Sequence, residues 1–420
     1  MITLLSVAGL FALAFSNGEV RVDGSTIEAK APGTDAALTL PADNELMWSW
    51  KNGLRFETAD GAFKFKFGGR IQWDNTWFHA GDDFTASGLV TDDGTEFRRS
   101  RLYISGDIYE DYFFKAQYDF AGEKAAFKDV FMGRRDVIGT ADVRLGHFKE
   151  PFSIGQLTSS RFTTFLERAL PDVFAPERNS GFAVYDTALD ENLTWAAGVF
   201  RTTDDAGFDQ QDGGYAATAR VTGTPVYEDD GARLVHVGAA YSMRAADGLQ
   251  FRQRPEAHLT NRWVDTGALA SDDVSLANVE LAGVVGPFHA TAEFMQASVD
   301  GAAGAADRDF SGYYGEVGYF ITGERRTYKR SSAAFDRVTP RRSWDKNGGK
   351  GAWEVAARYS SLDLTDSGIS GGEIDDVTLG LNWYLNNNMR MMFNYVNSSV
   401  ENGSFDESAD IFLLRFQVDW

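Results

Sequence analysis

Residues 63–74 read FKFKFGGRIQWD, and their strict alternation decides the fold class. Aromatic and aliphatic side chains fall on one face: Phe63, Phe65, Phe67, Ile71 and Trp73. Charged and amide side chains fall on the other: Lys64, Lys66, Arg70, Gln72 and Asp74. A period of two is the periodicity of a β-strand. Full charges at mid-strand are expected where one face lines a polar lumen and the other meets lipid. The stretch therefore predicts one strand of a transmembrane β-barrel.

The same alternation returns in residues 99–108 and again at the carboxyl end, in residues 412–420. A soluble β-sandwich also alternates, so a single such strand does not settle the class. The final residue, Trp420, closes an amphipathic strand with an aromatic side chain, which resembles the assembly signal of bacterial outer-membrane barrels. Repetition with large aromatic faces favours the membrane barrel.

Strand and link lengths predict an all-β fold, an antiparallel transmembrane barrel of about 16 strands with long loops folded into the lumen. Strands are expected near 61–78, 96–109, 112–121, 126–136, 141–151, 180–189, 192–202, 213–224, 232–244, 273–285, 287–299, 310–322, 351–363, 373–385, 388–399 and 408–420. Leu249–Glu256 is a weak further candidate that is left out. Tight links then fall on one side, which predicts the periplasm, and the longer links 79–95, 152–179, 245–272 and 364–372 fall on the other.

The composition excludes several classes of function. The 420 residues include 43 glycines and no cysteine, so neither a disulfide framework nor a thiolate metal site can be proposed. A formal net charge of −21 argues against nucleic acid as a partner. The apolar residues 1–16 predict a secretory signal peptide, 17–52 an N-terminal extension, and 53–420 the outer-membrane barrel.

Positive charge gathers in two overlong links, 152–179 and 324–350. Segment 324–350 is either a solvated basic turn or a segment folded toward the pore. Link 152–179 carries apolar anchors among polar groups, so we expect it to bend inward and present Ser159, Ser160, Arg161 and Arg168. By parity, seven further cations face the lumen: Arg70, Arg99, Arg101, Lys115, Arg220, Arg358 and Arg415. Each could instead pair with a carboxylate on the same faces, from Asp74, Asp107, Asp119 or Glu354.

Several stretches in this order resemble the phosphate-selective porins O and P. They are Gly68–Arg70, Phe97–Arg101, Lys128–Asp129, Thr158–Ser160, Glu167–Arg168, Phe320–Glu324, Gly351–Tyr359 and Leu379–Tyr384. The resemblance implies a homotrimer of 16-stranded barrels with an arginine ladder that leads to a phosphate site. Carried over by position, that site would use Arg70, Arg99, Asp129, Ser159, Ser160 and Arg168, with Arg101 beside them. Gln156 stands where phosphate-specific members have a lysine, and Arg101 where a tyrosine is expected.

The sequence therefore predicts a porin of the bacterial outer membrane, in contact with its lipid, that passes small anions such as phosphate, polyphosphate or chloride by diffusion. No cofactor, metal site or catalytic residue is expected. A general or cation-preferring porin is the alternative, and a barrel hydrolase is a distant third. The five histidines lack metal-ligand spacing, and Gly368–Gly372 matches G-x-S-x-G only in a glycine-rich link.

Overall fold

The computed structural model describes residues 19–23, 26–30, 37–39, 46–81, 84, 88–89, 91–122, 124–210, 213–246, 248–403 and 405–420. The predicted signal peptide, residues 1–16, lies outside these residues. Three short strands form a sheet of their own: β1 (Glu19–Asp23), β2 (Thr26–Lys30) and β3 (Ala37–Thr39).

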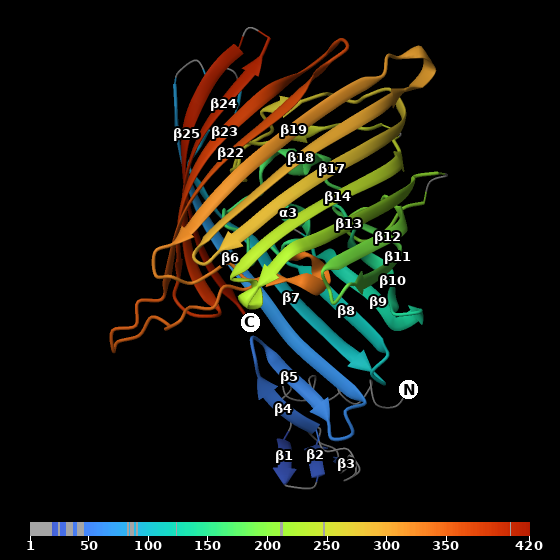
Figure 1. Ribbon diagram of the computed structural model, residues 1–420, viewed down its shortest axis with the longest axis vertical. Helices are drawn as coiled ribbons and strands as arrows, with labels where there is room; N and C mark the ends of the chain where they lie inside the picture. The colour runs from blue at the N-terminus through green and yellow to red at the C-terminus, as the bar shows by residue number, and fades with distance from the viewer. Residues whose placement is uncertain are drawn as a thin grey trace.

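Sixteen antiparallel strands form a closed barrel in which each strand pairs with the next in the chain, so the predicted count is confirmed (Figure 1). The strands are β6 (Phe63–Ala80), β7 (Gly94–Ile108), β8 (Tyr112–Asp119), β9 (Ala126–Ile138), β10 (Ala141–Lys149), β11 (Arg178–Ala188), β12 (Leu193–Arg201), β13 (Tyr215–Glu228), β14 (Arg233–Ala245), β17 (Ser271–Val285), β18 (Phe288–Gly301), β19 (Arg308–Phe320), β22 (Ala352–Asp366), β23 (Ile369–Tyr384), β24 (Met389–Asn402) and β25 (Phe405–Asp419).

The remaining elements are short and lie in the links or before the barrel. They are β4 (Leu46–Trp50), β5 (Leu54–Thr58), β15 (Arg252–Gln253), β16 (Val264–Asp265), β20 (Tyr328–Lys329), β21 (Ala334–Phe335), the helix α3 (Ile154–Leu157), and the 3₁₀ turns η1 (Leu170–Phe174), η2 (Asp229–Gly231), η3 (Ala302–Gly304) and η4 (Arg330–Ser332).

The barrel closes between its last strand and its first, at the stretch that decides the fold. β25 pairs with β6 from Ala409 opposite Ala80 to Asp419 opposite Arg70. Trp420 then exchanges both backbone hydrogen bonds with Gly69, at 3.0 and 3.1 Å. A Cβ atom on Gly69 would lie 2.5 Å from the Trp420 ring, so only glycine lets the ring cross the seam here.

The hairpin of β4 and β5 continues the seam below Trp420, because β5 pairs with the lower part of β6, from Leu54 opposite Phe67 to Glu57 opposite Lys64. The expected domain boundary at residue 53 falls inside this hairpin. Figure 1 shows β4 and β5 extending beyond the barrel at the end where the carboxyl terminus lies.

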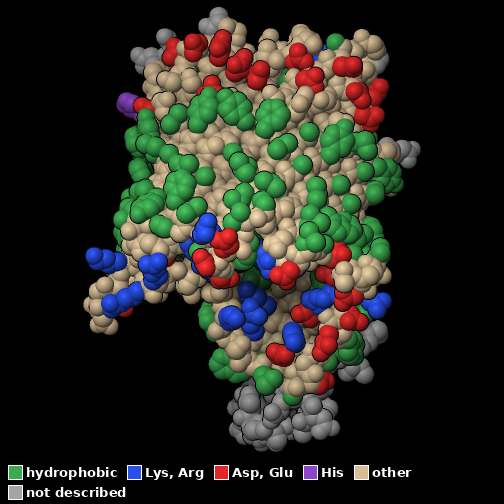
Figure 2. All heavy atoms as spheres, in the orientation of Figure 1, with side chains coloured by type: hydrophobic (Ala, Val, Ile, Leu, Met, Phe, Trp, Pro, Cys, Tyr) green, Lys and Arg blue, Asp and Glu red, His purple; other side chains and the backbone are tan. Residues whose placement is uncertain are grey.

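The outer surface has the character of a membrane protein. Its exposed large side chains include Phe97, Leu102, Val279, Tyr313, Leu379 and Phe416. Figure 2 shows apolar side chains as a belt around the visible face, with acidic side chains along one rim and most basic side chains toward the opposite end. Such a belt is expected where strands face lipid.

The rim half of the lumen is not uniformly polar. The inturned links bring buried apolar side chains into it: Phe84, Phe152, Leu170, Phe174, Phe251 and Trp263. These pack against lumen-facing apolar residues of the strands, such as Met295, Phe310, Leu362, Ile374 and Ile411. We call this cluster the plug core. It explains why Ile411 and Leu413 lie on the same face of β25 as Arg415.

Three links differ from the expectation or divide between alternatives. Residues 364–372 were expected to form a long link, which is wrong, because β22 and β23 continue to Asp366 and Ile369. The weak candidate Leu249–Glu256 contributes β15, which pairs with β16 inside the inturned link rather than in the barrel wall. Segment 324–350 has both of the expected characters. Residues 326–338 include buried residues, as expected for a segment folded toward the pore, whereas residues 341–348 are exposed, as expected for a solvated turn.

Candidate functional site

The site is built around residues 150–177, which connect β10 to β11 and which we call the constriction loop. The loop folds into the barrel as expected. Its helix α3 begins after Ser153, whose hydroxyl accepts a hydrogen bond from Gln156 N at 3.0 Å. Phe152, Phe165 and Leu166 are buried, so apolar contacts seat the loop against the wall.

Carboxylates on the wall from β17 to β25 hold the constriction loop in place. Glu280 accepts a hydrogen bond from Ile154 N at 2.5 Å, and Glu293 accepts one from Gly155 N at 2.9 Å. Glu280 also pairs with Arg220 at 2.7 Å. These acidic side chains are buried and spend their acceptor capacity on the loop and its neighbours. Glu280 and Glu293 therefore lie behind the loop.

Cations gather on the opposite side of the loop, on strands β6, β7, β8 and β11. We call this set the cationic wall: Arg70, Arg99, Arg101, Lys115 and Arg178. Arg70 Nη1 donates to Ser160 Oγ at 2.6 Å, and no carboxylate lies within ion-pair distance of Arg70 among the described residues. An arginine without an acidic partner attracts anions strongly, because its guanidinium keeps its charge at any physiological pH.

Other members of the cationic wall have acidic partners. Arg101 pairs with Asp119 at 2.5 Å, and Lys115 and Arg178 share Asp129 at 2.5 and 2.8 Å. These cross-strand pairs fix the side chains and leave Asp129 with two cations for one carboxylate. The predicted residues Arg70, Arg99, Arg101, Asp129 and Ser160 are thus brought together.

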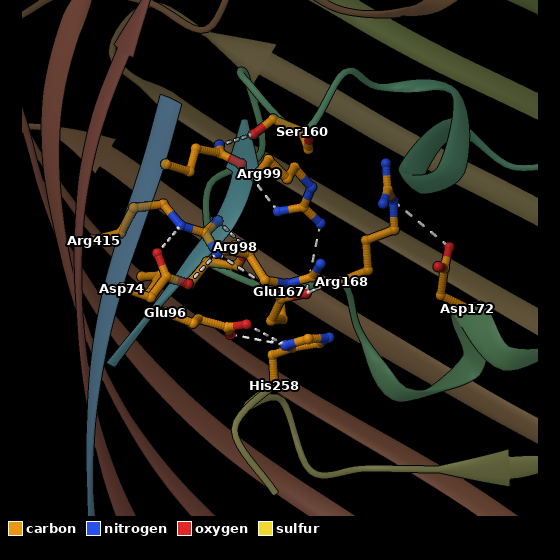
Figure 3. A network of polar contacts seen from close by, with 12 residues as sticks. Asp74, Glu96, Arg98, Arg99, Ser160, Glu167, Arg168, Asp172, His258 and Arg415 are labelled. Carbon is orange, nitrogen blue, oxygen red and sulfur yellow. Dashed lines mark hydrogen bonds and ion pairs between the residues drawn. The ribbon is translucent and has the colours of Figure 1, made fainter. Parts of the chain in front are cut away.

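Glu167 connects the constriction loop to three arginines (Figure 3). Its carboxylate accepts from Arg98 at 2.9 and 3.0 Å and from Arg415 at 2.9 Å, and it lies 3.8 Å from Arg99 Nη2. Burial alone would raise the pKa of Glu167, but the three arginines lower it well below its ordinary value. Glu167 therefore stays charged and cancels only part of the surrounding positive charge.

The pKa of Asp172 shifts in the opposite direction to that of Glu167. Asp172 lies 3.8 Å from Arg168 on the constriction loop (Figure 3). Burial raises the pKa of Asp172 to about 6, and Glu177 and Glu167 add to this against the opposing charges of Arg168 and Lys149. Arg168 itself donates to three loop carbonyls, those of Gly155, Gln156 and Thr158. The loop thus carries a carboxylate that changes charge near neutral pH.

Three predicted ladder residues lie elsewhere. Arg415 is fully buried and donates to Asp74 at 2.7 and 2.6 Å, so its charge is held inside the wall. Arg358 donates to Glu256 and to Glu167 O. Arg220 pairs with Glu280, as above. Ser159 accepts hydrogen bonds from Arg161 N and Nε at 3.4 Å and does not contact the cationic wall directly.

Parity did not identify Lys149 or Arg178 as site residues. Lys149 ends β10 and Arg178 begins β11, and the two residues are opposite each other in the register of these strands. They therefore flank the constriction loop where it leaves and rejoins the barrel wall. Their position at the two ends of a 28-residue loop is the sequence feature that could have marked them as site residues. Lys149 Nζ donates to Gln156 O and has no carboxylate within ion-pair distance in the part of the chain that the structure describes.

The link between β19 and β22, which we call the insertion, enters the lumen from the end of the barrel with short turns. Arg326 is buried, donates to Thr164 of the constriction loop, and lies 3.2 Å from Glu316. Phe335 N donates to Thr158 Oγ1 at 3.3 Å. This insertion supports the constriction loop from below.

Between the constriction loop, the insertion and strands β8–β13 lies a cavity of about 700 Å³, which we call the vestibule. Lys115 of the cationic wall and its partner Asp129 line it, together with Arg144, Lys149, Arg220 and Lys329. The vestibule therefore adjoins the cationic wall on the side of the short turns.

Within the described residues, no cluster of three histidine or acidic side chains is arranged to hold a metal ion. No helix in that part of the chain is long and apolar enough to cross a membrane.

Comparison with known proteins agrees with this geometry. The family model described as phosphate-selective porin O and P matches residues 65–420. Porin O of Pseudomonas aeruginosa is 27% identical over 463 residues, which cover 98% of this chain and 97% of that protein.

Solved structures support the fold alone, because their sequence identity is low. The outer-membrane channel DcaP of Acinetobacter baumannii aligns with a TM-score of 0.56 at 11% identity, over 87% of this chain and 99% of that one. An anion-selective porin from Comamonas acidovorans aligns with a TM-score of 0.54 at 13% identity, over 85% of this chain and 100% of that one.

Proposed function

Because the chain belongs to the phosphate-selective porin O and P family, we propose that it conducts small anions, inorganic phosphate, polyphosphate and chloride among them. It is an integral outer-membrane porin, a channel and not an enzyme. Passage would be by diffusion along the cationic wall, in contact with no cofactor.

One observation carries the anion preference: the constriction loop covers Glu280 and Glu293, and on its other side lie cations that lack a full acidic partner. Glu280 and Glu293 lie behind the loop and are engaged by its backbone. Arg70, Lys149 and the two cations that share Asp129 lie on the other side. A row of guanidinium and ammonium groups replaces part of an anion's hydration and repels cations.

Phosphate recognition has a candidate position at Arg70 and Ser160. A guanidinium fork matches phosphate oxygens in geometry, and a serine hydroxyl can donate to one of them. Arg70 Nη1 donates to Ser160 Oγ at 2.6 Å in the structure, so a phosphate oxygen bound by Arg70 would take the place of that hydroxyl. The site would include Arg99, Arg101, Asp129, Ser159 and Arg168 as surrounding groups.

The test is a planar bilayer under a KCl gradient. We expect a reversal potential on the chloride side, and we expect Arg70→Gln to move it toward zero. Arg134→Gln is the matched control, because Arg134 is half exposed and its guanidinium lies over Tyr112 near the turns. A cation-side reversal would overturn the proposal, whereas failure of phosphate to block chloride current would remove phosphate recognition only.

A general or cation-preferring porin is the second candidate, and its support is the net charge of −21. Acidic side chains gather along the rim in Figure 2, away from the constriction. Charges beyond about 10 Å are largely screened at ordinary salt, so this rim contributes little at the cationic wall. The same reversal potential separates the two candidates.

Two further features are proposed from the family. We propose a homotrimer, to be tested by native mass spectrometry of protein extracted in mild detergent, where a monomer would contradict it. We also propose that residues 1–16 are removed on export and that residues 17–52 precede the barrel as an extension. Sequencing the amino terminus of the exported protein tests both, and an intact Met1 would contradict the first.

A further inference from the structure

The vestibule has an uncommon wall, because aromatic rings face it from four neighbouring strands, β8 to β11. The ring centroids follow one another at 6.2 Å from Phe113 to Phe131, 6.0 Å from Phe131 to Phe148, and 6.4 Å from Phe148 to Tyr185. All four rings line the same cavity. Phe148 is buried in a small core cluster, whereas Phe113, Phe131 and Tyr185 are partly exposed. Porin lumens are polar as a rule, and the exposed part of these rings costs free energy in water. A row of rings beside a cavity is what a ligand with a flat apolar body needs.

A cation lies among these rings. The guanidinium carbon of Arg144 is 4.4 Å from the ring centroid of Phe131 and 4.5 Å from that of Tyr185. Its Nε is buried without a hydrogen-bond partner, and no carboxylate lies within ion-pair distance of Arg144 in the described part of the chain. Stacking occupies the faces of a guanidinium and leaves its N–H edge for an acceptor.

Two more cations increase the positive potential of the vestibule. Lys149 and Lys329 both line the cavity, and neither has an acidic partner within ion-pair distance among the described residues. Asp142 and Asp186 also line it, but the cations exceed them in number even when Lys115 and Asp129 are set aside as a pair. A bound ligand is therefore favoured when it carries negative charge.

From these contacts we propose that the vestibule binds aromatic carboxylates. The ligand ring would lie against Phe113, Phe131 and Tyr185, and its carboxylate would accept from the free edge of Arg144. A cavity of about 700 Å³ is within the range that holds small organic ligands. The proposal adds a ligand class to the proposed anion conduction. It rests on that function only because the ligand must reach the vestibule from outside.

The first experiment measures equilibrium binding by calorimetry on the full-length protein in detergent, so it does not depend on conduction. The probes are benzoate, cyclohexanecarboxylate and acetate. Stacking on rings favours benzoate over the saturated acid, although charge and size are similar. We expect benzoate to bind at least several-fold more tightly than the other two. Equal binding of benzoate and cyclohexanecarboxylate, or no binding of benzoate, would overturn the proposal.

The second experiment uses variants that keep the fold. Arg144→Gln and Phe131→Leu should each weaken benzoate binding by about tenfold, as expected for loss of a stacked cation or its ring. Arg134→Gln on the neighbouring strand is the control and should bind benzoate as the unchanged protein does. Unchanged affinity in Arg144→Gln, with the heat-modifiable folded band intact on gels, would overturn the assignment.

The two proposals fail in different ways. If chloride selectivity is absent but benzoate binds through Arg144, the anion-conducting proposal fails and the vestibule site stands. If chloride selectivity is present and benzoate neither binds nor blocks the current, the vestibule site fails and the anion-conducting proposal stands.

Discussion

Protonation of Asp172 should make the channel more anion-selective in mild acid. The pKa of this carboxyl is raised from an ordinary 3.8 to about 6, chiefly by burial. A pKa unit corresponds to about 1.4 kcal/mol, so the charged form is disfavoured by about 3 kcal/mol relative to water. A raised pKa means that the carboxyl is neutral below about pH 6 and charged above it. Lowering the pH from about 7.5 to about 5 therefore removes most of one negative charge beside Arg168.

The size of the effect follows from the place of that charge. A unit charge acts on an ion about 4 Å away with about 1 kcal/mol in water, and with more in a narrow pore. A difference of 1.4 kcal/mol is tenfold, so we expect the permeability ratio of chloride over potassium to rise about three- to tenfold. The ratio is measured from reversal potentials in a bilayer at about 0.1 M salt, where screening is moderate.

Asp172→Asn is the matched variant, because it keeps the side-chain shape and fixes the neutral form. It should show the acid-like ratio at every pH and lose the step. Glu167 and Glu177 stay charged over this range, since their pKa values are lowered by the arginines around them. Groups that titrate elsewhere contribute equally to both proteins, so the difference between the two profiles belongs to Asp172. A flat profile in the unchanged protein, or the same step in Asp172→Asn, would refute the reasoning.

Three other substitutions test the fold and the constriction. Gly69→Ala should lower stability by about 1–3 kcal/mol and weaken the heat-resistant folded band on gels, because its Cβ would meet the ring of Trp420, whereas Gly315→Ala on β19 has open space and should not. Trp263→Ala should cost about 3–5 kcal/mol in denaturant unfolding and increase single-channel conductance by loosening the plug core; unchanged conductance would separate that core from the pore. Glu167→Gln should raise chloride selectivity and lower the melting temperature, since it leaves buried arginines without their shared carboxylate; lower chloride selectivity would contradict this.

The barrel wall could be predicted because its rules are local. A period of two assigns Arg70 to the lumen and Trp73 to the exterior wherever the strand is regular. Link lengths then fix the strand number and the two sides. The exception at 364–372 has a local cause as well: Gly371 and Gly372 suggest a loop, but these glycines lie inside β23, whose pairing with β22 continues to Asp366 opposite Ile369.

The interior could be predicted only in outline, because it depends on contacts between distant links. Parity places Arg415 in the lumen correctly and allows its pairing with Asp74 across the seam, but only the folded constriction loop brings Glu167 to the same guanidinium. Likewise, Phe251 and Trp263 belong to a link that the sequence marks only as long. Once such links fold inward, lumen positions become either pore lining or protein core, and alternation does not distinguish these two environments.

The structure also explains how an acidic chain can suit an anion channel. Selectivity depends on the charges within about one Debye length of the narrowest passage, and not on the total. Glu280 and Glu293 accept hydrogen bonds from the backbone of the constriction loop, so the interactions that position the loop also hold these two negative charges behind it. In the proposed function, folding of the loop against Glu280 and Glu293 thus leaves Arg70 and its neighbours to face a passing ion. The architecture of the loop and the sign of the proposed selectivity therefore have the same physical cause.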